Sequence, residues 1–195
     1  MVRAGWIMVL ALFCATAGAQ EVSTVQKANK SQFSEQSWVL NGVGSRVMAG
    51  IFHVYEIALY LPHEHSVVVE ILDEDLPKRV ALTFNVDVKS AQLLEVTYKV
   101  MSENHTVEEL QKAEAGWQEF SMLFSGVKEI HRNDQIRLDF ANASGTQVSL
   151  NGRDLGRVND RGFMRAFLKI WLGERPVQAN LKEKLLGLKK ISRNE

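Results

Sequence analysis

Few of the residues that could do chemistry stand close together in this sequence. His63 and His65 lie two residues apart, and on a strand this spacing would place both imidazoles on one face, where they could bind a metal ion. The segment is more typical of a loop, and no further ligands for the pair can be identified. His53 and His131 are isolated, and no serine has an organised histidine and acid. We therefore expect neither a metal site nor a cofactor.

The composition is that of one globular domain. The chain has 195 residues, of which 46% are hydrophobic and 24% are charged, so it can bury a core of ordinary size. Its 23 Lys and Arg residues balance its 23 Asp and Glu residues. Because binding to phosphates needs clustered basic side chains, we expect no nucleic-acid partner.

Residues 1–19 have the pattern of a secretory signal peptide. A single basic residue, Arg3, precedes an apolar run from Trp6 to Ala15, and small residues follow up to Ala19. This pattern predicts cleavage after Ala19 and export to the periplasm or the medium. The run is short for a membrane span, so we expect no stable membrane insertion after cleavage, with an uncleaved anchor as the alternative. The only cysteine, Cys14, lies in this segment, so the mature protein would fold without disulfides.

The rest of the chain divides into an arm, a domain and a tail. Residues 20–36 are polar and predict an exposed arm, residues 37–190 predict a folded domain, and residues 191–195 predict a C-terminal tail. The domain opens with a segment rich in Val, Ile, Phe and Tyr, which predicts strands joined by tight turns. Gly42 and Gly44 are expected to flank a bend in this segment.

Helices and further strands are predicted next. Residues 66–75 are compatible with a strand, because they are rich in Val, or with a short helix, and we favour the helix; residues 78–88 alternate as in a strand. Ser90 predicts the N-cap of a helix through Met101. A second helix is expected to follow, because Thr106 and Glu109 have the capping-box spacing.

The C-terminal third repeats this order of strands and then helices. Asn151-Gly152 is a strong hairpin signal between alternating segments. Asp160 predicts the N-cap of a helix that ends before Gly173, and residues 177–186 predict a last amphipathic helix. Strands and helices come in groups without βαβ alternation, which indicates an α+β fold with an antiparallel sheet.

Several of these blocks together resemble the chalcone isomerase-like family, in particular its exported bacterial branch. Residues 40–46, LNGVGSR, are similar to that family's glycine-rich turn ending in an arginine, and residues 52–61, FHVYEIALYL, to its aromatic strand. The closing segment of the family is matched by Asn151-Gly152, by the helix ending in Ile170–Gly173 and by the leucines of the last helix. The resemblance covers residues 35–188.

This resemblance implies an open-faced β-sandwich, in which helices pack on one face of a long antiparallel sheet and enclose a ligand cleft. The family includes plant enzymes that cyclise chalcones to flavanones. Other members lack that activity and bind fatty acids or act as helper proteins. The fold alone therefore does not decide the function.

The arginine of the family's turn falls on Arg46. By the resemblance it points into the cleft, where a guanidinium could pair with a carboxylate or a phenolate, or stabilise an anion formed during a reaction. The alternative is a structural arginine that binds backbone carbonyls. A threonine of the isomerases falls on Tyr55, so a hydroxyl is kept on a larger side chain.

The remaining catalytic positions of the isomerases depart from the family pattern. Their catalytic tyrosine falls on Ala91 or Gln92, and their asparagine falls on Tyr98 or Lys99. The Ser or Thr that sets specificity falls on or near Met164, which replaces a polar contact with an apolar one. Losing this network should slow cyclisation by several orders of magnitude.

We therefore expect a ligand-binding cleft rather than a catalytic one. Its residues would be Arg46, Tyr55, Tyr98, Met164 and Phe167, and such a cleft suits a small amphipathic carboxylate, such as a fatty acid, or a phenolic ligand. Core packing is the alternative for Tyr98.

Three functions follow from these observations. The first is an exported, non-enzymatic domain that binds a small amphipathic anion. The second is an isomerase, an intramolecular lyase of the chalcone isomerase type, with another substrate. The third is a protein-interaction module, whose partner the sequence does not name.

Overall fold

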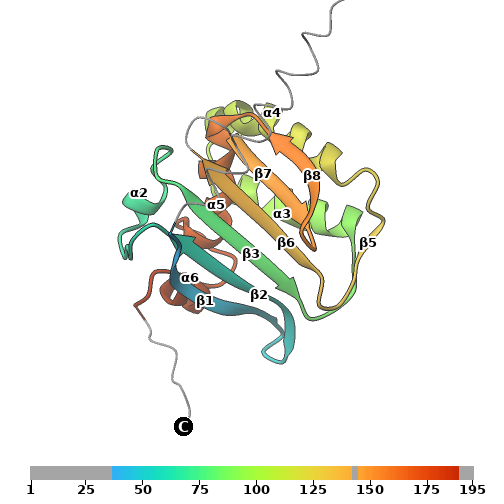
Figure 1. The fold of residues 1–195 in the computed structure, drawn as a ribbon, viewed down its shortest axis with the longest axis horizontal. Coiled ribbons are helices and arrows are strands. Elements are labelled where there is room, and N and C mark those ends of the chain that lie inside the picture. Colours follow the sequence, from blue (N-terminus) through green and yellow to red (C-terminus); the bar gives the residue numbers. More distant parts are fainter. Residues whose placement is uncertain (1–36, 142–144, 189–195) are drawn as a thin grey trace, which may run out of the picture. The chain divides into compact units, whose positions relative to one another are not determined.

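A six-stranded antiparallel sheet forms one layer of the molecule (Figure 1). The computed structural model describes residues 37–141 and 145–188. The expected signal peptide, arm and tail lie outside the described residues. The strands follow the order β1-β2-β3-β6-β7-β8, and each pairs antiparallel with its neighbours. Their bounds are Val39–Met48, Phe52–Leu61, Lys78–Phe84, Gln135–Ala141, Gly145–Leu150 and Arg153–Val158.

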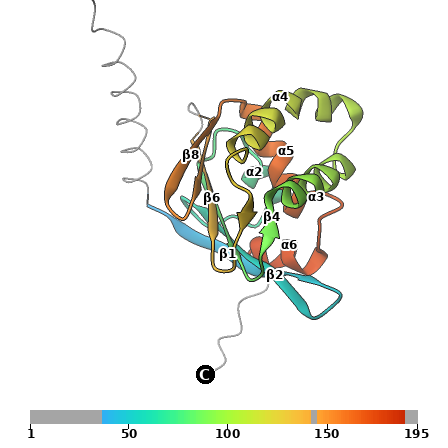
Figure 2. The ribbon, with the colours of Figure 1, turned by 90° about the vertical axis from the view of Figure 1, so that its right-hand side faces the viewer.

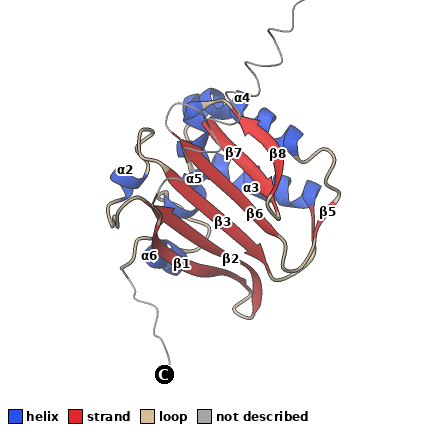
Figure 3. Ribbon diagram, viewed as in Figure 1, coloured by secondary structure: helices blue, strands red, loops and turns tan. Residues whose placement is uncertain are grey.

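The main helices cover one face of this sheet and leave the other open, as Figure 2 shows. The helices are α2 (Val68–Ile71), α3 (Ser90–Glu103), α4 (Val107–Leu123), α5 (Arg161–Leu172) and α6 (Ala179–Leu185). A two-stranded ribbon, β4 (Val88–Lys89) and β5 (Glu129–Ile130), lies beside α3. The predicted α+β, open-faced architecture is confirmed (Figure 3).

The hydrophobic core lies between the sheet and the helices, with α5 at its centre. This helix contacts α3, α4 and β7, so most of its surface is buried rather than a single stripe. Its aromatic residues continue those of α4 in one cluster, in which Phe120 lies 5.4 Å from Phe163 and 5.1 Å from Phe167 between ring centroids. The core therefore holds the C-terminal helices tightly on the sheet.

Within residues 37–141 and 145–188, no helix is long and apolar enough to cross a bilayer.

Several local predictions are confirmed. Thr106 accepts a hydrogen bond from the Glu109 backbone, and the Glu109 side chain accepts one from the Thr106 backbone. The Asp160 carboxylate accepts from the Phe163 backbone at the start of α5. Asn151 and Gly152 have φ values of 52° and 77°, which form the tight turn between β7 and β8.

Two local predictions are wrong. Gly42 and Gly44 do not flank a bend; both lie inside β1, and the chain reverses at Ala49 and Gly50 instead. Ser90 is not the N-cap of α3 but its first residue, after Lys89. Both errors arise because sequence signals for glycine and serine do not show what packs against them.

Candidate ligand-binding site

Two register shifts in the β1–β2 hairpin determine which face carries the candidate site. Relative to the rest of the hairpin, the pairing of Gly42–Arg46 is displaced by one residue. Asn41 is the extra residue in β1 that begins the displacement, and Val54 is the extra residue in β2 that ends it. Because side chains alternate along a strand, an extra residue exchanges the two faces for the residues beyond it.

The first shift brings Arg46 to the helix side of the sheet. Arg46 lies directly opposite Tyr55, which shares its face with the buried residues Ile57 and Leu59. Alternation from the exposed residue Leu40 without an extra residue would turn the arginine to the open face. The displaced register therefore places a guanidinium and a phenol side by side, next to the core.

The extra residue, Asn41, is fixed by its side-chain amide. Its Nδ2 donates to the backbone carbonyl oxygens of His65, at 2.9 Å, and Leu185, at 2.7 Å. Its Oδ1 accepts from the His65 backbone N–H at 2.7 Å. Asn41 therefore ties β1 both to the segment after β2 and to the end of α6.

Two glycines of β1 allow α6 to approach the strand closely. A Cβ atom at Gly42 would lie 2.1 Å from the carbonyl oxygen of Lys184, and one at Gly44 would lie 2.7 Å from Cδ1 of Leu181. Both distances are too short for non-bonded atoms, so only glycine fits. The start of α6 consequently lies beside Arg46.

Gln178, the N-cap residue of α6, holds Arg46 in place. Its Oε1 accepts from Arg46 Nη1 at 3.2 Å and from the Val47 backbone N–H at 2.9 Å, and its Nε2 donates to the Ser45 carbonyl at 3.3 Å. Arg46 Nη1 also donates to the Val47 carbonyl at 2.9 Å. Among the described residues, the Nε and Nη2 groups of this half-buried arginine have no hydrogen-bond partner.

Tyr55 is positioned from the opposite side by α5. Its hydroxyl oxygen lies 3.0 Å from Trp171 Nε1, and its ring lies 5.8 Å from that of Phe84 between centroids. Indole N–H can only donate, so the Tyr55 oxygen accepts and its own proton remains available to an acceptor.

Burial raises the pKa of Tyr55, although the Trp171 hydrogen bond and the positive charge of Arg46 act in the opposite direction. The phenol is therefore neutral at neutral pH and can donate a hydrogen bond. Together, Arg46 and Tyr55 place a charged donor and a neutral donor side by side, and donors of these two kinds can pair with a carboxylate or a phenolate.

The structure separates the other expected site residues from this pair. Phe167 lies one helical turn from Trp171, with ring centroids 5.4 Å apart, and is buried among the core aromatics. Tyr98 lies in the α3–α4 interface, where its ring is 5.2 Å from that of Trp117 and its hydroxyl donates to Glu114 at 3.1 Å.

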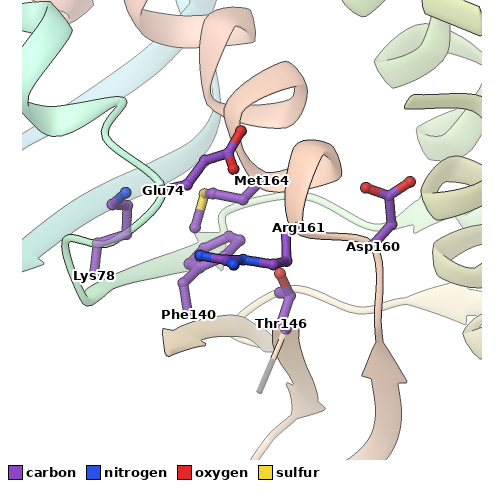
Figure 4. A pocket seen from close by; sticks show the side chains of 8 residues that line it. Glu74, Lys78, Phe140, Thr146, Asp160, Arg161 and Met164 are labelled. Atoms are coloured by element: carbon purple, nitrogen blue, oxygen red, sulfur yellow. The ribbon is translucent and has the colours of Figure 1, made fainter. Parts of the chain in front are cut away.

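Met164 lines a small hollow at the start of α5, toward the opposite end of that helix from Trp171 (Figure 4). Charged side chains of both signs surround it. The full lining consists of Glu74, Lys78, Phe140, Gly145, Thr146, Asp160, Arg161 and Met164.

Trp171 and Gln178 are site residues that the sequence did not indicate as such. A tryptophan in an otherwise apolar helix needs an acceptor for its N–H, and this requirement could have pointed to a polar partner. Gln178 contacts residues more than 130 positions away in the chain, and no local pattern identifies such a contact.

No cluster of three or more metal-ligating side chains occurs within residues 37–141 and 145–188. His65 Nδ1 lies 3.0 Å from Glu70 Oε2, and His131 lies 3.7 Å from Asp87. Each of these two histidines therefore has an acidic neighbour.

Comparisons with known proteins identify the fold and the family of the chain. The fold is similar to that of a fatty-acid binding protein from Arabidopsis thaliana, with a TM-score of 0.65 and 18% identity over 77% of this chain and 87% of that chain. No curated protein matches the sequence. A family model described as chalcone isomerase-like matches residues 19–187. Since that match spans both the strands that carry Arg46 and Tyr55 and the helices that position them, the chain belongs to the chalcone isomerase-like family.

Proposed function

We propose that this protein is an exported, non-enzymatic carrier that binds a small amphipathic anion, such as a fatty acid. Arg46 and Tyr55 hold the head group of the ligand. The observation that carries this proposal is the arrangement of Arg46 opposite Tyr55. The indole N–H of Trp171 donates a hydrogen bond to the Tyr55 hydroxyl oxygen.

The donors of the site match a carboxylate. Two groups of the Arg46 guanidinium lack partners in the described part of the chain, and the Tyr55 proton is free to be donated. A carboxylate has two oxygens with several lone pairs, so it can accept from both residues at once. A neutral ligand would leave the half-buried positive charge without a counter-charge, at a cost in free energy.

The surroundings of these donors are apolar. The Phe84 ring packs against the Tyr55 ring, and the Trp171 indole contacts the Tyr55 hydroxyl. Phe167 is buried in the core, where it packs against Trp171. A ligand that is polar at one end and apolar elsewhere fits such a site. The similar Arabidopsis protein is described as a fatty-acid binding protein, which supports the same ligand class.

The residues around the site favour binding over catalysis. Ala91 and Gln92, where the resemblance places the catalytic tyrosine of the isomerases, are exposed at the start of α3. Tyr98 is engaged with Glu114 in the α3–α4 interface. Cyclisation needs a polarised carbonyl and an oriented phenolate, and Arg46 and Tyr55 alone supply only part of this network.

Export is proposed from the sequence of residues 1–19. Fractionation of cells that express the full chain, followed by mass determination, should find a protein that begins at Gln20 in the exported fraction. Recovery of the uncleaved chain in a membrane fraction would contradict export as a free protein.

The first experiment is identification of the bound molecule. The chain from Gln20 onward is purified, and native and denaturing mass spectrometry should reveal a co-purifying fatty acid or a similar anion. The same protein is then titrated with oleate. Arg46→Ala should weaken oleate binding by roughly 1.5–3 kcal/mol, which is roughly a 10- to 150-fold rise in Kd.

Arg161→Ala is the matched control, because it removes one arginine from an exposed ion pair with Asp75 and should change oleate affinity little. If Arg46→Ala binds oleate as the wild type does, Arg46 is not in the site. If Arg161→Ala is the weaker binder, the ligand occupies the hollow in Figure 4 instead. Turnover of a chalcone or another enone that depends on Arg46 and Tyr55 would show an isomerase.

A further inference from the structure

The end of the β1–β2 hairpin carries an exposed apolar group of side chains, which we call the tip cluster. It consists of Met48, Ile51 and Phe52, which are 53%, 73% and 60% exposed. No Asp, Glu, Lys or Arg occurs between Arg46 and Glu56. Large apolar side chains gathered at one exposed point mark an interaction surface.

The tip cluster continues the face that carries the candidate site. Met48 and Phe52 are cross-strand partners, so their side chains lie next to each other. Met48 is two residues beyond Arg46 along β1, which places both on the same face. Figure 2 shows the hairpin end projecting beyond the body of the domain on the helix side.

A backbone hydrogen bond closes the turn at the tip of the hairpin. The Ile51 N–H donates to the Met48 carbonyl at 3.2 Å, and Ala49 and Gly50 form the turn with φ values of 50° and 75°. Backbone groups that are already paired carry little cost when a segment enters lipid. This one hydrogen bond can persist when the tip enters an apolar phase.

We propose that the tip cluster inserts into the surface of a lipid bilayer, docking the protein reversibly so that the Arg46–Tyr55 site exchanges its ligand with the membrane. This inference rests on the proposed function, because an amphipathic anion resides in membranes. Stable protein interfaces bury about 800 Å² on each partner. Three side chains at a projecting point provide far less, whereas the same side chains can wedge between lipids.

The absence of charge at the tip determines what kind of membrane binding is expected. Binding driven by apolar insertion occurs on neutral lipid and depends weakly on salt, unlike binding through basic patches. The protein should therefore bind vesicles of phosphatidylcholine alone, and raising the salt concentration should not release it.

Vesicle flotation with the chain from Gln20 onward tests this inference. Removing residues 1–19 avoids an apolar segment that would itself bind lipid, and it keeps the entire core, which spans Ile57–Leu186. Ile51→Ser with Phe52→Ser should lower the partition coefficient onto phosphatidylcholine vesicles roughly tenfold or more.

A matched control carries Val107→Ser with Met122→Ser, which removes two equally exposed apolar residues, 74% and 63% exposed, from α4. This variant should bind vesicles as the wild type does. Failure of the wild type to float, an equal partition coefficient for the tip variant, or an equal loss in the control would each overturn the inference. A wild type that ignores vesicles but captures one defined protein would show that the tip binds a protein partner.

Oleate affinity in solution separates this inference from the proposed function. The tip variant should bind oleate with unchanged affinity, since Arg46 and Tyr55 are intact, although its binding to vesicles is weakened. If the wild type binds vesicles, the tip variant does not, and neither of the two binds oleate, membrane docking is supported and the carrier function is contradicted.

Discussion

Lys78, the first residue of β3, is buried next to the hollow at the start of α5. Its side chain has no exposed surface, and its Nζ donates to the backbone carbonyl of Asp73. Burial lowers the pKa of Lys78 from about 10.5 to about 8, and nearby acidic side chains, Asp73 and Glu74 foremost, offset only part of this effect. The domain therefore keeps a lysine whose charge works against folding.

Substituting Lys78→Met tests this cost. Between pH 8 and 10.5 the unfolded chain binds a proton at Lys78 that the folded chain has released, so stability rises with pH in this window. Below pH 8 the penalty is complete and amounts to roughly 3 kcal/mol. At pH 7 the variant should gain up to roughly 2 kcal/mol, because the lost hydrogen bond offsets part of the relief.

Urea denaturation at several pH values measures the gain at pH 7 and its change with pH, each as the difference in the free energy of unfolding between the variant and the wild type. Taking this difference removes the contribution of Tyr55, whose raised pKa makes stability fall at higher pH. The exposed residue Lys112 provides a control, because Lys112→Met should leave the slope of wild-type stability against pH unchanged. A stability difference between Lys78→Met and the wild type that stays constant from pH 8 to 10.5 would contradict the assignment.

Single residues were the hardest part of the site to predict from the sequence. Arg46 and Tyr55 were predicted through the family resemblance, and the structure places them opposite each other on β1 and β2. The roles of Gln178 and Trp171 depend on contacts between segments that are more than 100 residues apart. Such contacts leave no local pattern, because they exist only once the chain has folded.

At the scale of elements, the docking of α6 on β1 positions the site. The helix contributes Gln178 to Arg46, and it can do so only because Gly42 and Gly44 leave room for its backbone and side chains. Asn41 adds a hydrogen bond from the strand to the end of the same helix. The position of the guanidinium is therefore coupled to the packing of one strand and one helix.

Gly42→Ala should separate these two elements. The added methyl group would meet backbone atoms of Lys184 and Leu185, which cannot rotate away, so we expect a loss of roughly 1–3 kcal/mol or more in the free energy of unfolding. Oleate affinity should fall as well, because Gln178 moves with α6. Chemical denaturation measures the first effect and titration the second.

Gly126→Ala is the control for this substitution, since nothing lies within 4 Å of the added methyl group. Its stability should stay within about 0.5 kcal/mol of the wild type. Equal stabilities of the two variants would show that β1 and α6 are not closely packed in solution.

Most elements were predictable because their signals are local. The capping box at Thr106, the Asp160 cap and the Asn151-Gly152 turn each act within a few residues, and all three occur in the structure. The register shifts in β1 and β2 were not predictable. The shift in β1 is accompanied by hydrogen bonds from Asn41 to the backbone carbonyls of His65 and Leu185, which the segment itself does not encode.

The whole molecule is held by one core between the sheet and the helical layer. Core residues come from β2 through the end of α6, and the site lies at the margin of this core. A ligand bound at that margin contacts both β1–β2 and the C-terminal helices. Binding should therefore stabilise the entire domain rather than one loop.

Thermal unfolding with oleate measures this coupling. Ligand at a hundredfold excess over Kd should add about 2.7 kcal/mol to the free energy of unfolding, which corresponds to a rise in Tm of roughly 5–10 °C for a domain of this size. The methyl ester of oleate lacks the carboxylate and should raise Tm much less. An ester that matches oleate would mean that the head group is not recognised.

The two register shifts of the hairpin also determine how the insertion or deletion of one residue would change the face on which Arg46 lies. Each extra residue alone would exchange the two faces of the sheet for all side chains beyond it. The two shifts cancel, so the residue pairs on either side of the displaced stretch Gly42–Arg46 have the same register. A deletion of one residue at Asn41 would turn the guanidinium toward the open face while keeping its sequence neighbours. The insertion or deletion of one codon would thus move this arginine between the two faces of the sheet without a substitution of the arginine itself.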